Sequence, residues 1–220
     1  MVVKLYGYPK GGHTVTAAVI LLEKNIPFKM MPIDIREGEH RSVEYRAMQP
    51  FGQLPCIDDN GFVMYECRAI ARYLVDKYPK DGPALIPAAN DVIGRARFEQ
   101  AASVEVTNFQ PHAFKIYVEG MRKVRQGIPK DQAAYDDAVS QLSATLDVYE
   151  ATLAKQKFLA GDEITLVDLF HLAFGQLLAP SGCDLMTSKG PNVARWWKEV
   201  TSRPSLKNLQ LGDDIVSTAE

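Results

Sequence analysis

The chain has 220 residues, of which 46% are hydrophobic and 24% are charged. This composition is ordinary for a globular protein and excludes the disordered and collagen-like classes. The net charge of −2 provides no basic surplus to neutralise the phosphates of a nucleic acid. No run approaches the ~18 apolar residues of a membrane-spanning helix, and the chain begins without the basic and apolar segments of a signal peptide. We therefore expect a cytoplasmic protein with neither a nucleic-acid nor a membrane partner.

Cysteine and histidine residues are few and widely separated. Cys56, Cys67 and Cys183 are too scattered for a disulfide framework. The four histidines include no pair at the spacing of metal ligands on a helix. We expect reduced thiols and no metal site.

Short apolar runs and helical patterns alternate at the start of the chain. The runs at residues 2–7 and 28–34 predict strands, and the apolar stretch at 14–25 between them predicts a helix. This is a βαβ unit, whose long crossover implies a parallel, right-handed strand pair.

A hairpin follows the βαβ unit. After a short helical stretch at residues 42–48, the turn Asp59-Asn60-Gly61 separates strand-forming runs at 56–58 and 62–65. This pattern indicates an antiparallel hairpin. With a further helix after the hairpin, the whole arrangement is that of a thioredoxin-like α/β domain.

Proline and glycine then interrupt every pattern, so we expect a linker at residues 81–90 between a first domain at 1–80 and a second at 91–220. The second domain shows no convincing strand and is predicted to be an all-α helical bundle. Pro111 is expected to bend its first helix, because the ring removes a backbone donor and clashes with the preceding turn. The helical patterns run over residues 91–118, 130–155, 166–178 and 191–202.

Six distinctive motifs lie along the chain. In the first domain they are Gly38-Glu39-His40-Arg41, Gln49-Pro50-Phe51-Gly52-Gln53-Leu54-Pro55 and Tyr65-Glu66-Cys67-Arg68-Ala69-Ile70. In the second they are Phe98-Glu99-Gln100-Ala101-Ala102-Ser103, Phe158-Leu159-Ala160-Gly161 and Thr165-Leu166-Val167-Asp168. In the last, Thr165 can cap a helix while Asp168 returns a bond to the amide of the cap. In content, order and spacing, the motifs resemble those of phi-class glutathione S-transferases over nearly the whole chain.

The resemblance implies a binding site for glutathione, a tripeptide with two carboxylates, one ammonium group and one thiol. His40 and Arg41 would bind the glycine carboxylate through charge-assisted hydrogen bonds, and Gln53 would donate from its side-chain amide. The proline at position 55 is cis in the family. The amide and carbonyl of Leu54 before Pro55 would therefore pair with the cysteinyl unit, as in strand addition.

Glu66 and Cys67 stand at the junction between the hairpin and the next helix, which is expected at residues 66–78. The free amides of that helix start favour the γ-glutamyl carboxylate, and Glu66 would bind the ammonium group. The family usually has serine where Cys67 stands, and a thiol is the weaker donor. Cys67 could also form a mixed disulfide with oxidised glutathione.

The serine that activates the glutathione thiol in phi-class enzymes is missing. In an ungapped alignment its position falls on Gly11, which can donate only from its backbone amide. The candidates for stabilising the thiolate are Thr14, His13 and the amides of the Gly11-Gly12 turn with the helix dipole behind them. Thr14 also fits the N-cap of the predicted helix.

A hydrophobic acceptor site is expected between the two domains. Phe109, His112, Ala113 and Ile116 share one face of a predicted helix, and Tyr8 lies in the loop expected opposite them.

The resemblance implies an enzyme of detoxification or stress that conjugates glutathione, as co-substrate and without a cofactor, to hydrophobic electrophiles. Two alternatives stay open because the serine is missing. One is a glutathione-binding carrier of hydrophobic ligands that performs no turnover. The other is an interaction module like the transferase-like domain of elongation factor gamma subunits, which would not bind glutathione. The resemblance also implies a homodimer, with Phe51 and Arg68 near the interface.

Overall fold

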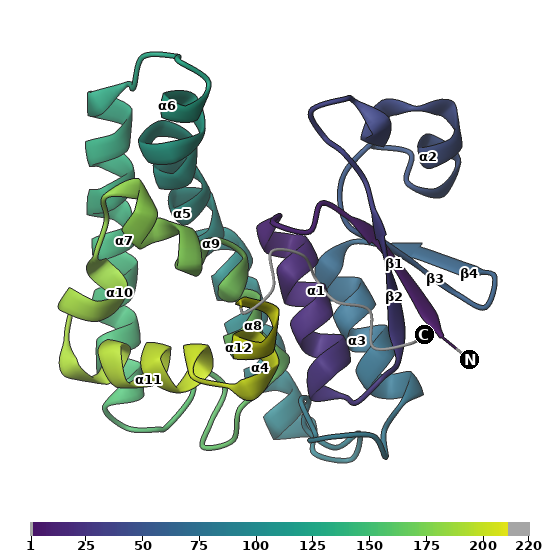
Figure 1. Ribbon diagram of the computed structural model, residues 1–220. Coiled ribbons are helices and arrows are strands. Elements are labelled where there is room, and N and C mark those ends of the chain that lie inside the picture. The colour runs from purple at the N-terminus through teal and green to yellow at the C-terminus, as the bar shows by residue number, and fades with distance from the viewer. Residues whose placement is uncertain (1, 211–220) are drawn as a thin grey trace. The chain divides into compact units, whose positions relative to one another are not determined.

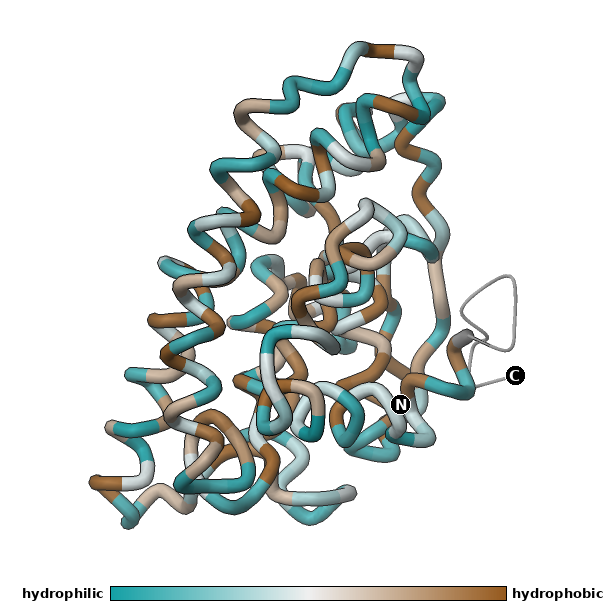
Figure 2. The backbone as a smooth tube through the Cα atoms, turned by 90° about the vertical axis from the view of Figure 1, so that its left-hand side faces the viewer, coloured by the Kyte–Doolittle hydropathy of each residue, from teal (hydrophilic) through white to brown (hydrophobic). Residues whose placement is uncertain are grey.

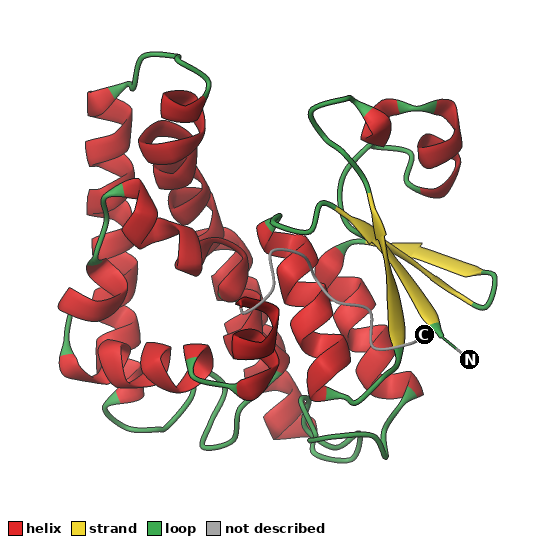
Figure 3. Ribbon diagram, viewed as in Figure 1, coloured by secondary structure: helices red, strands yellow, loops and turns green. Residues whose placement is uncertain are grey.

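The computed structural model describes residues 2–210, which form two compact units. One unit contains residues 2–85 together with 203–210, and the other contains residues 86–202. The first combines a sheet with helices, and the second is built from helices (Figure 1; Figure 3). The structure thus has the predicted fold class, a thioredoxin-like α/β unit followed by a helical one.

The sheet of the first unit has the strand order β2-β1-β3-β4. β1 is parallel to β2, as the βαβ pattern predicts, and antiparallel to β3. The predicted hairpin is confirmed: β3 and β4 pair antiparallel across Asn60 (φ 57°) and Gly61 (φ 89°), whose left-handed backbones suit a tight hairpin turn. The strands are β1 (Val3–Gly7), β2 (Phe28–Pro32), β3 (Cys56–Asp59) and β4 (Phe62–Tyr65).

Two helices, α1 (Gly12–Glu23) and α3 (Cys67–Lys77), lie side by side against one face of this sheet (Figure 1). β1 buries Val3 and Leu5 on alternate positions, as a strand with one covered face does. α1 is buried without interruption over residues 16–21. A helix that is apolar on all sides belongs inside a unit, so α1 forms the centre of this core.

The connection between β2 and β3 contains a 3-10 turn, η1 (Glu39–Arg41), and a short helix, α2 (Val43–Met48). The sequence predicts α2 but not η1. Ser42 is the N-cap of α2, and its hydroxyl accepts a hydrogen bond of 3.1 Å from the amide of Tyr45.

Near its C-terminal end, α1 is hydrogen-bonded to the two segments at which the chain leaves the first unit and returns to it. The fully buried Lys24 donates to the carbonyl of Pro83 at 2.9 Å. The carboxylate of Glu23 receives two hydrogen bonds from Arg203, at 2.7 and 2.6 Å, and one from the Ser205 hydroxyl. These donors lower the pKa of Glu23 although its burial acts in the opposite direction.

α12 (Pro204–Gln210) accordingly packs on α1. The predicted helical domain at 91–220 therefore differs from the structure at residues 203–210, which belong to the first unit. The remaining ten residues of that prediction lie outside the described part of the chain.

The helical unit contains the four predicted helical segments together with short helices that the patterns do not show. In Figure 2 hydrophilic and hydrophobic positions alternate along the helices, as in amphipathic helices with one buried side. Among residues 2–210, none of the helices has both the length and the apolar character that crossing a bilayer requires. The helices are α4 (Val92–Val104), α5 (Gln110–Tyr117), α6 (Lys123–Arg125), α7 (Gln132–Leu153), α8 (Leu166–Phe170), α9 (Leu172–Leu178), α10 (Leu185–Ser188) and α11 (Pro191–Thr201).

The irregularity predicted at Pro111 is present as a π-helical turn at Glu105–Phe109. The amide of Gln110 donates to the carbonyl of Glu105, five residues earlier instead of four. A proline cannot donate a helical hydrogen bond, so the regular ladder is interrupted where the sequence indicates.

Asp168 forms a fully buried polar centre at the start of α8. Its carboxylate accepts from the amide and hydroxyl of Thr165, at 2.8 and 3.2 Å, which confirms the predicted capping box. It also accepts from the amide of Leu159 at 3.1 Å and from the indole of Trp196 at 2.9 Å. One side chain thus joins a loop, α8 and α11.

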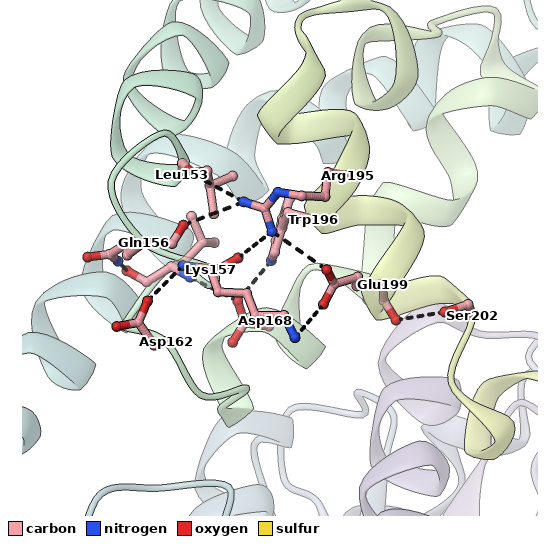
Figure 4. Close-up of polar contacts among 10 residues, drawn as sticks. Leu153, Gln156, Lys157, Asp162, Asp168, Arg195, Trp196, Glu199 and Ser202 are labelled. Atoms are coloured by element: carbon pink, nitrogen blue, oxygen red, sulfur yellow. Dashed lines mark hydrogen bonds and ion pairs between the residues drawn. The ribbon is translucent and has the colours of Figure 1, made fainter.

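Arg195 makes a second connection between α11 and α7. Figure 4 shows its guanidinium pointing toward the backbone at the end of α7, where it donates to the carbonyls of Leu153 at 3.0 Å and Lys157 at 3.1 Å. The last carbonyls of a helix lack partners within the helix, and a cation there also suits the helix dipole.

Candidate functional site

Three segments of the first unit meet at one end of the sheet, and two of them belong to the motifs at residues 49–55 and 65–70. Tyr6 of β1 pairs with Cys56 of β3, and Cys56 pairs with Tyr65 of β4. β1 therefore ends, β3 begins and β4 ends at the same end of the sheet. The segments that continue from these points are residues 8–13, 54–55 and 66–67.

Leu54 has an unpaired backbone at this end of the sheet. The Leu54–Pro55 peptide bond is cis, as the resemblance implies. Within residues 2–210, neither the amide nor the carbonyl of Leu54 takes part in a hydrogen bond. An extended peptide can pair with such a backbone as a short additional strand.

Glu66 turns the chain from β4 into α3 with a left-handed backbone (φ 72°, ψ 104°). Such a conformation costs a non-glycine residue about 1–3 kcal/mol and is found preferentially at functional sites. The side chain of Glu66, the N-cap residue, makes no capping hydrogen bond to α3, which begins at Cys67. The backbone amides and the dipole at such a helix start favour a carboxylate.

The turn η1 places His40 and Arg41 beside the loop that leads to Leu54. Gly52 in that loop (φ 64°) approaches so closely that a Cβ there would lie 2.9 Å from the carbonyl oxygen of His40. The Nδ1 atom of His40 is buried and has no hydrogen-bond partner in the described part of the chain.

Gly11, at the expected position of the missing serine, is the N-cap of α1 (φ −78°, ψ 128°). Its amide donates to the carbonyl of Tyr8 at 2.8 Å, so that amide is engaged, contrary to the expectation for the Gly11-Gly12 turn. As a glycine it has no side chain with which to cap α1, whose first turn starts at Gly12. The backbone amides and the dipole at such a helix start favour an anion.

Thr14 is not the N-cap that the sequence suggests, because α1 begins two residues earlier. Its side chain is only 1% exposed and packs against Gly7, where a Cβ would lie 2.5 Å from the Thr14 hydroxyl oxygen. A Cβ on Gly11 would lie 3.4 Å from the same oxygen. The Thr14 hydroxyl therefore lies next to the place where a serine side chain would begin.

His13 and Cys67 bring the starts of α1 and α3 together. The thiol of Cys67 donates to the carbonyl of His13 at 3.4 Å, and Cys67 is buried. Burial and the charge of Arg68 lower the pKa of His13 to about 4. His13 is consequently neutral at pH 7 and has no positive charge with which to stabilise a thiolate.

Three residues predicted for the hydrophobic acceptor site belong to the core of the helical unit. Phe109, Ala113 and Ile116 are at most 1% exposed, and the Phe109 ring lies 4.5 Å from the ring of His171. His112 on the same helix is half-buried, as is Tyr8 in the first unit. The apolar periodicity of this helix thus reflects internal packing.

Three aromatic residues that the sequence analysis missed form a more open group in the helical unit. The Phe114 ring lies 5.2 Å from that of Phe174 and 6.4 Å from that of Tyr117, and Phe114 is 41% exposed. The spacing of Phe114 and Tyr117, one helical turn apart, was a signal in the sequence for a shared aromatic face.

A pocket of about 300 Å³ lies elsewhere in the helical unit, between α4 and the end of α7. Arg97 and Val104 line it from α4, and Val148 and Thr152 line it from α7. None of the residues predicted for the site lines this pocket. Over residues 2–210, His, Cys, Asp and Glu side chains form no group of three or more that could hold a metal ion.

This chain is similar to known proteins of one family. The models for the glutathione S-transferase N-terminal and C-terminal domains match residues 1–76 and 109–204. Glutathione S-transferase F9 of Arabidopsis thaliana is 38% identical over 208 residues, which cover 94% of this chain and 95% of the relative. Glutathione S-transferase hmp2 of Hypomyces subiculosus is 41% identical over 204 residues, covering 92% and 95%. The crystal structure of glutathione transferase F7 from Populus trichocarpa is similar with a TM-score of 0.90 at 33% identity, covering 96% of this chain and 98% of that one.

Proposed function

This chain belongs to the glutathione S-transferase family of enzymes, among phi-class homologues, and on that premise we propose that it conjugates glutathione to hydrophobic electrophiles in the cytoplasm, in detoxification or stress. The observation that carries the proposal is that the segments at residues 8–13, 54–55 and 66–67 meet at one end of the sheet. Every residue proposed to bind glutathione lies in the first unit.

The proposed contacts follow the chemistry of the tripeptide. The unpaired backbone of Leu54 binds the cysteinyl unit, and the side chain of Gln53 donates to the glutathione backbone or its carboxylate. The start of α3 at Cys67 binds the γ-glutamyl carboxylate, and Glu66 binds the ammonium group. His40 and Arg41, in η1, bind the glycine carboxylate.

The first test concerns the two charged ends of glutathione. His40→Ala and Glu66→Ala are each expected to weaken glutathione binding about 10- to 100-fold, because a hydrogen bond to a charged group contributes ~1.5–3 kcal/mol. Titration calorimetry with glutathione measures the change. Glu44→Ala, which removes an exposed carboxylate on α2, serves as control and should bind as the wild type does. Unchanged affinity in both site variants would mean that the site is misassigned.

A second test uses the close approach of Gly52 to His40. Gly52→Ala is expected to weaken glutathione binding about fivefold or more, because the new Cβ must displace the His40 carbonyl. Gly61→Ala is the matched control, since Gly61 also has a left-handed backbone (φ 89°) but open space around it. Both variants should lose roughly 1 kcal/mol of stability, and only Gly52→Ala should lose affinity. Equal affinities would contradict the proposed role of the η1 turn.

Activation of the thiol is proposed to come from the uncapped first turn of α1, assisted by the Thr14 hydroxyl. Lowering a thiol pKa from ~8.5 to ~6.5 requires about 2.7 kcal/mol of preferential thiolate stabilisation. Amide donors and a helix dipole can supply a large part of this energy. His13, neutral at pH 7, is left with N–H donation only.

The hydrophobic electrophile is proposed to contact the aromatic group of Phe114, Tyr117 and Phe174 in place of the buried residues around Ala113. Glutathione S-transferase I from maize, 29% identical to this chain with a TM-score of 0.86, was solved in complex with an atrazine–glutathione conjugate. That acceptor is an aromatic molecule, which suits recognition by open aromatic rings.

A carrier of hydrophobic ligands is the second candidate, and the observation that favours it is the absence of a side-chain hydroxyl at Gly11. Measuring glutathione affinity and conjugation rate on the same preparation separates the two. Binding with no turnover of any electrophile would support the carrier.

We also propose that the chain forms a homodimer. Phe51 is 68% exposed, and its ring lies edge-on to Tyr65 at 6.1 Å, so a large apolar side chain is available on the first unit. Light scattering at micromolar concentration should report twice the chain mass, and a monomer would contradict the assembly.

A further inference from the structure

The residues proposed to bind the glycine carboxylate and those proposed to bind the cysteinyl unit lie in one stretch of chain, residues 38–54. Local hydrogen bonds connect this stretch from end to end. The amide of Arg41 donates to the Gly38 carbonyl at 2.8 Å, and the amide of Ser42 donates to the Glu39 carbonyl at 3.0 Å. The cap of α2 at Ser42 then leads into the helix that carries Tyr45.

Gln53, the residue before Leu54, is held on both sides of its backbone. The hydroxyl of Tyr45 donates to the carbonyl of Gln53 at 2.8 Å. The side-chain oxygen of Gln49 accepts from the amide of Gln53 at 3.1 Å. Two side chains from α2 and its C-cap thus engage both backbone groups of one loop residue.

The two side chains that hold Gln53 are buried. Tyr45 is 2% exposed and Gln49 is 1% exposed, so neither side chain is open to a ligand. Burial raises the pKa of Tyr45, which keeps its hydroxyl protonated and able to donate. Buried polar groups are costly unless they are hydrogen-bonded, so these bonds hold the Gln53 backbone in one position.

Leu54, the next residue, differs from Gln53 in the hydrogen bonding of its backbone. Both backbone groups of Gln53 are engaged, whereas those of Leu54 have no partner in the described residues. A peptide ligand binds more tightly to a backbone that is already fixed, because less conformational entropy is lost on binding.

We propose that Tyr45 and Gln49 are positioning residues, which fix the Gln53 backbone so that Leu54 presents its amide and carbonyl to the cysteinyl unit of glutathione. The inference rests on the proposed glutathione site. It adds two residues that touch no part of the substrate.

The test is a cycle of two variants and two ligands. Tyr45→Phe removes only the hydroxyl and is expected to weaken binding of S-hexylglutathione about tenfold. The second ligand is S-hexylglutathione methylated on the cysteinyl amide nitrogen, which cannot donate to the Leu54 carbonyl. Its affinity, already low, should fall less in Tyr45→Phe, because one of the two bonds that the hydroxyl supports is already absent.

Tyr73→Phe is the matched control. The Tyr73 hydroxyl also donates to a buried acceptor in the same unit, the carboxylate of Asp59, at 2.9 Å. Its loss should lower stability and leave both affinities unchanged. Gln49→Met removes the other bond at similar volume, should reproduce the pattern of Tyr45→Phe, and provides the test if Tyr45→Phe does not fold.

The outcomes distinguish failure of the positioning role from failure of the proposed glutathione site. Equal weakening of both ligands by Tyr45→Phe, or a fall in melting temperature with unchanged affinities, would overturn the positioning role. A wild-type protein that binds neither ligand would overturn the proposed glutathione site itself.

Discussion

Asp168→Asn should lower the free energy of unfolding of the helical unit by about 3–5 kcal/mol. The carboxylate is fully buried and accepts from Thr165, Leu159 and Trp196. An asparagine keeps one acceptor and turns an NH₂ group toward the remaining donors, so at least one buried donor loses its partner, at ~1–3 kcal/mol each. Urea unfolding followed by tryptophan fluorescence reports this unit, since both tryptophans lie in α11.

Asp162→Asn is the control for this prediction. Asp162 is exposed and accepts one bond, of 3.1 Å, from the amide of Lys157. Its substitution should cost about 1 kcal/mol or less. Similar losses in the two variants would show that the Asp168 centre adds little to the stability of the unit.

Gly11→Ser should lower the pKa of the bound glutathione thiol by about one to two units, because a hydrogen bond to an anion contributes ~1.5–3 kcal/mol. The backbone at Gly11 (φ −78°, ψ 128°) is ordinary for any residue. A Cβ there would lie 3.1 Å from the Tyr8 carbonyl and 3.4 Å from the Thr14 hydroxyl, so only a small adjustment is needed. A serine can also cap α1, which should add only a few tenths of a kcal/mol of stability, because glycine is itself a fair N-cap.

Gly11→Ala separates the hydroxyl from the added methyl group. It introduces the same Cβ without a donor and should leave the thiol pKa and the conjugation rate near their wild-type values. Thr14→Ala tests the neighbouring hydroxyl: a lower rate with intact folding would assign part of the activation to Thr14. If Gly11→Ser leaves a high thiol pKa unmoved, the missing serine does not limit this protein.

Local signals in the sequence were sufficient for most of the fold. The turn Asp59-Asn60-Gly61 predicts the hairpin because a tight hairpin turn needs left-handed backbones, which Asn and Gly adopt readily. The capping box of Thr165 and Asp168 is equally local, since both partners lie within one helical turn. The further contact of Asp168 with Trp196 spans 28 positions and leaves no periodic signal.

The errors come from non-local contacts and from helix ends. Arg203 bonds Glu23 across 180 positions, so no pattern near residue 203 reveals that the chain returns to the first unit. Helical periodicity identified the apolar face of Phe109 and Ala113 but could not tell a core face from a surface that binds ligands. The sequence predicts the start of α1 two residues late. The reason is that the N-cap Gly11 has no side chain to signal its role, whereas Thr14 has the side chain of a good cap.

Part of the candidate site could be predicted from the sequence. The cis Pro55 follows from the resemblance, and the junction at Glu66 follows from the order of hairpin and helix. The support beneath the site was not predictable. In the sequence Tyr45 shows only as an apolar position of a short helix and Gln49 as a polar residue after it, and their bonds to Gln53 depend on the path of the loop.

The most direct test of the account is the ultraviolet absorbance of the glutathione thiolate bound to the wild-type protein, titrated against pH. We propose that the amides of the α1 start, with Thr14, favour ionisation of the thiol although Gly11 stands where the serine is expected. We therefore expect an apparent thiol pKa at least one unit below the ~8.5 of a free thiol. A bound thiol that still titrates near 8.5 would contradict the account and leave a protein that binds glutathione without activating it.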